Sequence, residues 1–222
     1  MNIAIAIDGP AGAGKSTIAK LAAKELSFIY VDTGALYRAI GLCAYRNNIG
    51  SKDVPQILKM LEDIKVELAF NDKGEQIVLL NGEDVSSLIR TPEISMYASD
   101  VSAIPEVRAF LLDLQRNMAK TNNIIMDGRD IGTVVLPNAK VKIFLTASAE
   151  VRAKRRFDEL IEKGMDVKYE DVLKDVETRD YNDSHRETAP LKPAEDSVIV
   201  DTSGLDLQQS VQKLISIMKE NM

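Results

Sequence analysis

Cysteine, histidine and tryptophan are almost missing from this chain of 222 residues, which has one cysteine, one histidine and no tryptophan. A single cysteine excludes an intrachain disulfide framework and a multi-cysteine zinc or iron–sulfur site. Cys43 stands in an apolar helical run, which predicts core packing. A single histidine excludes a histidine-rich metal site. Any Ser/His or Cys/His mechanism would have to use His185, whose polar surroundings favour the surface.

Positive net charge and long apolar runs are missing as well. The chain has 28 Lys and Arg against 34 Asp and Glu, a net charge of −6, which argues against a nucleic-acid-coating protein. No apolar run approaches the length of about 18 residues that a membrane span needs, and the first residues carry no basic signal segment. With 45% apolar and 28% charged residues, we expect a cytoplasmic, soluble single domain over 1–222 that binds neither nucleic acid nor membrane.

Strand and helix patterns alternate along most of the chain. The stretches that fit strands are 3–7, 28–31, 124–127, 141–145 and 197–200. Those that fit helices are 15–26, 35–46, 105–120, 149–162, 169–181 and 207–219. This alternation predicts an α/β fold with a five-stranded parallel sheet flanked by helices.

Residues 63–100 depart from this alternation. Residues 66–70 alternate apolar and polar side chains, the turn at 71–74 follows, and the apolar run 77–80 ends at Asn81-Gly82. Short strands joined by Asn/Asp/Gly turns are typical of antiparallel hairpins. We therefore expect a small antiparallel β insert here, with an elaborated surface loop as the alternative.

The strongest motif follows the first strand and fits the phosphate-binding pattern G-x-x-x-x-G-K-[ST]. It reads Gly9, Pro10, Ala11, Gly12, Ala13, Gly14, Lys15 and Ser16, with Thr17 next. Glycines let backbone amides surround an anion at the N-terminus of the following helix. Lys15 would contact the β- and γ-phosphates, and the Ser16 hydroxyl would join the Mg²⁺ shell. This P-loop predicts a nucleoside-triphosphate site; without Asn-Lys-x-Asp, a guanine-reading switch is disfavoured.

The placement of the 11 arginines is the second signal. Arg38 and Arg129 follow strand ends, where parallel sheets of this kind form their ligand crevice. The planar guanidinium binds two phosphate oxygens at once and stays charged. Exposed salt-bridge partners are the alternative for each arginine, and we keep it for Arg46, Arg90 and Arg116.

Two aspartates also end apolar strands. Asp127 has the form of a Walker-B acid, which holds Mg²⁺ directly or through water; a turn-forming role before Gly128 is the alternative. Asp8 stands directly before the P-loop, so capping that loop fits the pattern as well as a metal-binding role does. An arginine-rich site without an imidazole suits an acceptor that is already anionic, because such a transfer needs positioning and charge neutralisation rather than a base.

Taken together, these segments resemble the bacterial cytidylate kinases. The resemblance rests on residues 7–17, 32–38 and the Asp-Gly-Arg-Asp-Ile-Gly-Thr segment at 127–133. It also covers Arg179 to Arg186 with Ala189-Pro190-Leu191, and the β insert that precedes Arg108. It implies a P-loop nucleotide kinase fold with a short helical lid at 148–165, and transfer of the ATP γ-phosphoryl group to CMP or dCMP with Mg²⁺, by a monomer.

The resemblance also implies site residues. The monophosphate site would consist of Thr33, Arg38, Ser99, Arg108, Arg129, Asp130, Arg179, Asp183 and Arg186. Within it the arginines hold phosphate, whereas the cytosine is read by Ser99, Arg108 and Asp130, and the sugar hydroxyls by Asp183. The catalytic charges would be Lys15, Arg129, Arg152, Arg156 and Arg179, and the Mg²⁺ ligands Ser16 and Asp127. Arg152, Arg155 and Arg156 would lie in the lid.

Two other functions fit parts of the sequence. The first 40 residues would suit a small-molecule P-loop kinase such as shikimate kinase, but the β insert and the late arginines do not support it. A nucleotide-dependent binding or switch protein would instead hydrolyse ATP slowly and independently of any acceptor.

Overall fold

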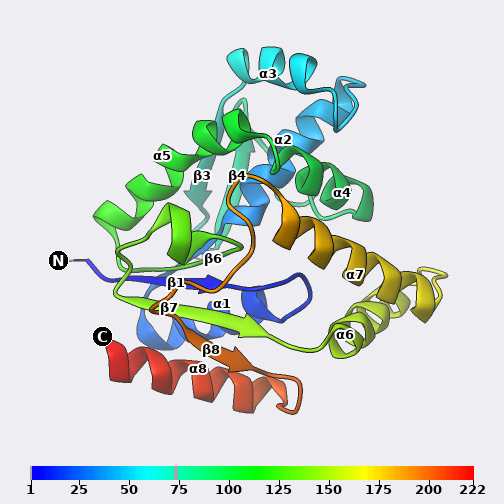
Figure 1. Ribbon diagram of the computed structural model, residues 1–222. Coiled ribbons are helices and arrows are strands. Elements are labelled where there is room, and N and C mark those ends of the chain that lie inside the picture. The colour runs from blue at the N-terminus through cyan, green and yellow to red at the C-terminus, as the bar shows by residue number, and fades with distance from the viewer. Residues whose placement is uncertain (1, 73–74) are drawn as a thin grey trace.

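The computed structural model describes residues 2–72 and 75–222, so part of the expected turn at 71–74 lies outside the described residues. Its centre is the predicted parallel sheet of five strands, which the structure arranges in the order β2-β6-β1-β7-β8 (Figure 1). The strands are β1 (Ala4–Asp8), β2 (Ile29–Asp32), β6 (Ile124–Gly128), β7 (Val141–Thr146) and β8 (Val198–Asp201). All five carboxyl ends therefore meet at one edge of the sheet, where P-loop proteins bind ligands.

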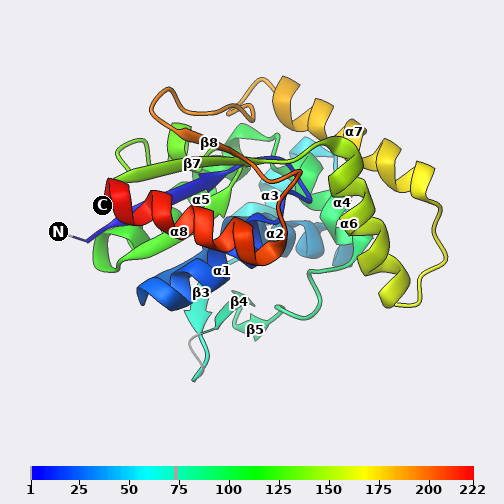
Figure 2. The same cartoon turned by 90° about the horizontal axis from the view of Figure 1, so that it is seen from below.

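Helices cover both faces of this sheet. Helices α1 (Lys15–Leu26) and α8 (Leu207–Asn221) pack together on one face, seen from below in Figure 2, where they meet Ile5, Ile7 and Ile143. Helix α5 (Pro105–Thr121) and the short π-helix η1 (Ile131–Val135) cover the other face, over Ala6 and Met126. Successive strand residues thus face opposite layers, as period-two alternation requires.

A second layer of structure is attached through α2 (Thr33–Arg46). It contains α3 (Val54–Glu62), a three-stranded antiparallel sheet of β3 (Val66–Phe70), β4 (Gln76–Leu80) and β5 (Glu83–Asp84), and α4 (Pro92–Val101). Leu36 and Ile40 of α2 share one apolar cluster with Ile57, Val78 and Ile89 of this layer. The insert sheet is therefore packed on α2 rather than on the parallel sheet.

Two helices of this layer were not expected. Asp53 caps the first turn of α3, with Pro55 in that turn, and Thr91 caps α4, which begins at Pro92. Both are ordinary helix-start signals. The antiparallel strands therefore end at Asp84, and a helix occupies the stretch into which the β insert was expected to extend.

Helices α6 (Ala149–Glu162) and α7 (Tyr169–His185) form an antiparallel pair beyond the carboxyl ends of the strands (Figure 1). Ala153, Leu160, Val172 and Val176 make a small core between them. The bounds of α6 match the prediction, whereas α7 continues past the predicted end at 181. Within the described residues, no helix is both long enough and apolar enough to cross a bilayer.

Candidate active site

The loop between β1 and α1 folds around its own lysine. Lys15 is buried, and its Nζ donates hydrogen bonds to the carbonyl oxygens of Gly9 and Pro10, each at 2.7 Å. Gly14 enters α1 with φ of 86°, a left-handed conformation that favours glycine. A Cβ on Gly9 would lie 1.9 Å from the carbonyl oxygen of Leu145, so a side chain cannot fit there. The result is a tight loop at a helix N-terminus, the geometry that binds phosphate.

The charge of Lys15 depends on what surrounds it. Burial, followed by the neighbouring Arg129, lowers the pKa of Lys15 to about 7. Asp127, Asp183 and Asp8 oppose this shift. Because a bound phosphate would stabilise the ammonium form, it would raise the pKa of Lys15 again and recruit a proton.

Asp127, at the carboxyl end of β6, faces Ser16 of the P-loop. Ser16 Oγ donates to Asp127 Oδ2 at 2.8 Å, and the hydroxyl of Tyr30 in β2 donates to Asp127 Oδ1 at 3.0 Å. Burial raises the pKa of Asp127 to about 6, with the nearby Asp32 acting in the same direction. One carboxylate and one hydroxyl beside a phosphate loop fit Mg²⁺, which usually binds one or two carboxylates and substrate phosphates while keeping several waters.

Three arginines lie within electrostatic range of Arg179, and one of them, Arg129, also acts on Lys15 of the P-loop. Burial lowers the pKa of Arg179 to about 10, and the positive charges of Arg129, Arg38 and Arg156 act in the same direction. Asp183 offsets this repulsion through its charge, and among the described residues no hydrogen bond or salt bridge of Arg179 is found. Such concentrated positive charge is suited to binding an anion with several negative oxygens.

Asp183 of α7 balances part of this charge. Its Oδ2 accepts a hydrogen bond from Arg129 Nε at 2.8 Å. Burial alone would raise the pKa of Asp183, but Arg129, Arg179 and Arg186 together lower it below its ordinary value. The carboxylate therefore stays ionised and holds Arg129 in a fixed orientation, 54 residues away along the chain.

A second polar cluster lies around Asp130. This buried carboxylate pairs with Arg108 on one oxygen and with Arg186 Nη2 at 3.5 Å on the other. The guanidinium of Arg108 also lies 5.5 Å from the ring centre of Tyr37, a cation–π distance. Arg186 extends the cluster toward α7, since its Nε donates to the carbonyl oxygen of Ala189.

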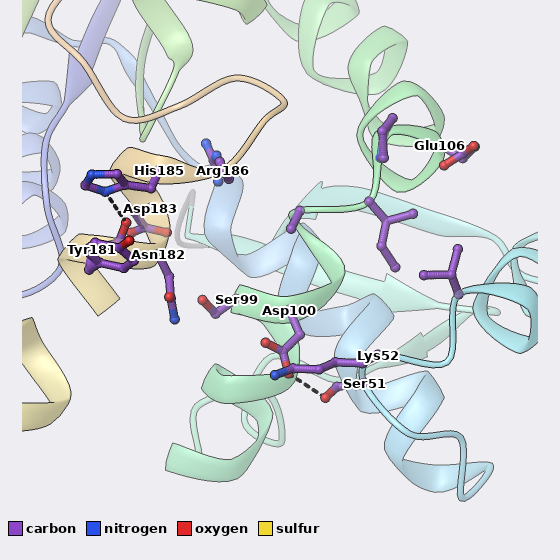
Figure 3. A pocket seen from close by; sticks show the side chains of 14 residues that line it. Ser51, Lys52, Ser99, Asp100, Glu106, Tyr181, Asn182, Asp183, His185 and Arg186 are labelled. Atoms are coloured by element: carbon purple, nitrogen blue, oxygen red, sulfur yellow. Dashed lines mark hydrogen bonds between the residues drawn. The ribbon is translucent and has the colours of Figure 1, made fainter. Parts of the chain in front are cut away.

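A cavity of about 520 Å³ opens beside this cluster, between the start of α5, α4 and the end of α7. Figure 3 shows Ser99 facing it from α4, with Asp183 and Arg186 on the opposite wall. His185 also lines the cavity and stacks on Tyr181, with ring centres 4.1 Å apart. The structure therefore brings Ser99 and Asp183 to one cavity, with Arg186 linking that cavity to Asp130.

Asp8 and Thr33 fasten the segment 127–133 to the P-loop and to α2. The two oxygens of Asp8 accept hydrogen bonds from the backbone amides of Ile131 and Gly132, each at 2.7 Å. Asp8 therefore caps η1, a partner that the sequence pattern did not indicate. Thr33 Oγ1 donates to the carbonyl oxygen of Asp127 at 2.8 Å. Burial raises the pKa of Asp8 to about 6, because backbone donors and Lys15 only partly compensate for desolvation.

The arginines of α6 differ in their partners. Arg152 is buried and bonds the carbonyl oxygens of Ala147 and of Ala11 in the P-loop, as well as both oxygens of Asp180 in α7. Arg155 donates to the carbonyl oxygen of Thr202. Arg156 is half-buried and contacts Glu159 at 3.2 Å on its own helix. Of the two lid arginines assigned catalytic charges, Arg156 is the one with the weaker protein contacts.

Fold and site together define a class: an α/β nucleotide kinase of the P-loop type. The sequence profile of the family described as cytidylate kinase matches residues 5–220. The cytidylate kinase of Caldicellulosiruptor saccharolyticus is 54% identical over 97% of this chain and 95% of its own length. The cytidylate kinase of Streptococcus pneumoniae strain 70585 is 48% identical over 96% of this chain and 95% of its own length. The chain belongs to the cytidylate kinase family and is a phosphotransferase.

Solved structures support the fold. An uncharacterized protein from Eubacterium ventriosum superposes with a TM-score of 0.56 over 99% of both chains, at 14% sequence identity. Identity this low shows a shared fold and nothing about the substrate.

Tyr30 and Tyr37 are among the site contacts that sequence reasoning missed, as are Asp180, which binds Arg152, and Asp32, which binds Arg38. Tyr30 stands in an apolar strand and pairs with Ile125 in the register of β2 and β6. Its hydroxyl meets Asp127 only because the two strands are neighbours in the sheet. A tyrosine among strand residues is ordinary in sequence, so no local signal could have marked it.

Proposed function

We propose that this protein transfers the γ-phosphoryl group of ATP to CMP or dCMP, giving ADP and CDP or dCDP. The observation that carries the proposal is the contact between the P-loop and the end of β6: Ser16 Oγ donates to Asp127 at 2.8 Å, and Arg129, held by Asp183, follows two residues later. A donor phosphate chain on the P-loop would thus end beside the arginines that receive an acceptor phosphate. An oxygen of the acceptor phosphate attacks the γ-phosphorus, the bond to the β-phosphate oxygen breaks, and ADP leaves.

The chain's own charges supply most of the catalysis. Lys15 and the P-loop amides, from Gly9 to Thr17, hold the donor phosphates. Arg38, Arg129 and Arg179 neutralise the acceptor phosphate and the transferring group. Such charge neutralisation in a shielded site is the main requirement of phosphoryl transfer. Ser16 and Asp127 would hold Mg²⁺, which supplies further positive charge next to the donor phosphates when it is bound.

Recognition of the base falls to Ser99, Arg108 and Asp130. Cytosine offers an amino donor at N4 and acceptors at N3 and O2. Asp130 can accept from N4, where uracil has an acceptor, and Arg108 can donate to N3 or O2. A buried polar pair discriminates strongly, because the wrong base leaves these groups unpaired. Asp183 would contact the sugar hydroxyls of the acceptor nucleotide. Thr33 would contact the same nucleotide near its phosphate, and Arg186 would bind that phosphate.

Helix α6 and its loop act as the lid. Closure over ATP shields the γ-phosphoryl group from water until the acceptor is in place. Arg156 would then reach the donor phosphates, and Arg152, which already bonds the P-loop carbonyl of Ala11, would fix the lid to the loop. We expect a monomer that works in the cytoplasm without nucleic-acid or membrane partners.

A panel of acceptors tests this function. ADP formation is measured with CMP, dCMP, UMP, AMP and shikimate, each with ATP and Mg²⁺. We expect the highest kcat/KM with CMP or dCMP, weaker turnover with UMP, and none above background with shikimate. Activity only with AMP or with a non-nucleotide would refute the proposal. Slow ATP hydrolysis that no acceptor accelerates would point to a nucleotide-dependent switch instead.

A further inference from the structure

Gln76, the first residue of β4, pairs its side-chain amide with the backbone of Asp32. Its Oε1 accepts a hydrogen bond from the Asp32 amide at 2.8 Å, and its Nε2 donates to the Asp32 carbonyl oxygen at 3.2 Å. β2 is an edge strand of the parallel sheet, so its outer backbone groups would otherwise lack a strand partner. The side chain of one residue thus occupies the place of a neighbouring strand at the last residue of β2.

Asp32 is the residue that sets the start of α2. Its Oδ1 accepts from the backbone amide of Ala35 at 3.1 Å and so caps the helix, and its Oδ2 accepts from Arg38 Nη2 at 2.7 Å. Arg90, from the same insert as Gln76, lies 3.7 Å from that oxygen. The insert therefore contacts both the backbone and the carboxylate of Asp32, through Gln76 and Arg90.

Arg38 is held on one side and free on the other. One of its nitrogens is paired with Asp32, while Nε is one of two buried side-chain atoms without a hydrogen-bond partner among the described residues. Arg38 also lies within electrostatic range of Arg179. A buried donor without a partner, next to other cations, is available to an anion.

We propose that Gln76 is a positioning residue: by holding the backbone of Asp32, it lets the antiparallel insert orient Arg38 toward the phosphate of the acceptor. This inference rests on the proposed function for the identity of that acceptor. This role gives the insert a specific task. β4 packs beside α2 (Figure 1), and its first residue, Gln76, contacts Asp32, the N-cap residue of α2. Gln76 itself would not touch the substrate.

The test compares Gln76→Ala with Gln76→Met, which keeps most of the side chain's length but neither hydrogen bond. We expect both variants to raise KM for CMP about fivefold to tenfold, the size that two lost hydrogen bonds allow, with KM for ATP unchanged. Gln208→Ala is the matched control, since it removes an exposed amide side chain from the first turn of α8. It should leave both KM values unchanged.

A second measurement does not depend on the acceptor. Amide hydrogen exchange at Ala35 reports the cap that Asp32 makes on α2, and it should be faster in both Gln76 variants than in the wild type. Unchanged exchange, or equal increases in the two KM values, would overturn the proposal. If Gln76→Met has wild-type kinetics while Gln76→Ala does not, the size of the side chain matters and its hydrogen bonds do not. That result would also overturn the proposal. If the wild type does not phosphorylate CMP at all, the proposed function fails, while the exchange experiment still decides whether Gln76 holds α2.

Discussion

Tyr30 donates its phenolic hydrogen to Asp127 Oδ1 at 3.0 Å, the oxygen that Ser16 does not use. Asp127 therefore cannot rotate freely, since each oxygen has its own hydroxyl partner on a different element. A carboxylate fixed in this way presents Oδ2 toward the P-loop. Groups that orient a metal ligand from behind commonly change metal affinity tenfold or more when they are removed.

We predict that Tyr30→Phe weakens the apparent affinity for Mg²⁺ about tenfold, while ADP binding without Mg²⁺ stays unchanged. The ring and its packing remain, so only the hydrogen bond to Asp127 is lost. Fluorescent ADP titrated with Mg²⁺ measures both quantities. Tyr45→Phe, in the exposed part of α2, is the control. An unaltered Mg²⁺ titration in Tyr30→Phe would show that Ser16 alone suffices to orient Asp127.

Asp130 carries the second prediction, on the choice of base. Truncation to alanine would leave Arg108 and Arg186 without their shared carboxylate, and unpaired buried charges are costly. Asp130→Asn keeps the shape and offers a donor that can pair with O4 of uracil. We predict that it lowers the CMP-to-UMP ratio of kcat/KM at least about tenfold.

The matched control for Asp130→Asn is Asp113→Asn, which neutralises an exposed carboxylate of α5, the helix that carries Arg108. It should leave the ratio at the wild-type value. Calorimetric ADP affinity is measured in both variants, and we expect it to be unchanged. If the base ratio of Asp130→Asn equals that of the wild type, Asp130 does not read the base.

The third prediction concerns the pH dependence of ADP binding, which Lys15 should control. Its pKa is about 7 in the free protein, lowered mainly by burial, and a bound phosphate raises it. At pH 8 the free amine is therefore largely neutral, and nucleotide binding takes up nearly one proton. The affinity for ADP should accordingly fall as pH rises above about 7.

Calorimetry at pH 8, without Mg²⁺ and in two buffers of different ionisation enthalpy, counts the protons taken up. Lys24→Met is the control, because it removes an exposed lysine near the end of α1. On binding ADP it should take up the same number of protons as the wild type. Heats that do not depend on the buffer would contradict a depressed pKa for Lys15.

Much of the fold followed from local patterns. The P-loop is contiguous in sequence, and the strands of the parallel sheet are apolar runs bounded by turn residues, so both were predictable. Helices α3 and α4 were missed although Asp53 and Thr91 are helix caps. Their signals are short, and they stand beside the hairpin pattern that dominates the insert.

The partners of the site residues were harder to predict, because they depend on which strands become neighbours. Tyr30 and Asp127 are 97 residues apart, and Arg129 and Asp183 are 54 apart. A count of arginines near strand ends indicated a phosphate site. It could not show that Arg152 is bonded on all sides by protein while Arg179 is not. That distinction comes from packing between α6 and α7.

The last prediction concerns that packing. Both terminal nitrogens of Arg152 contact Asp180, at 2.9 and 2.5 Å, and the Arg152 side chain is only 5% exposed. A shielded two-point pair between α6 and α7 should couple more strongly than a solvent-exposed pair. We predict a coupling free energy of about 1–3 kcal/mol in a double-mutant cycle of Arg152→Ala and Asp180→Ala. Urea unfolding of the four proteins measures it.

The exposed pair Lys154 and Asp158, on the same helix α6, provides the matched cycle. Its coupling should be about 0.3–0.5 kcal/mol, as for other exposed pairs one helical turn apart. Because Arg152 also bonds the carbonyl oxygen of Ala11, Arg152→Ala should weaken ADP binding, whereas Lys154→Ala should not. Equal coupling in the two cycles would mean that Arg152 is not anchored by α7. The lid and the P-loop would then have to be joined by other contacts.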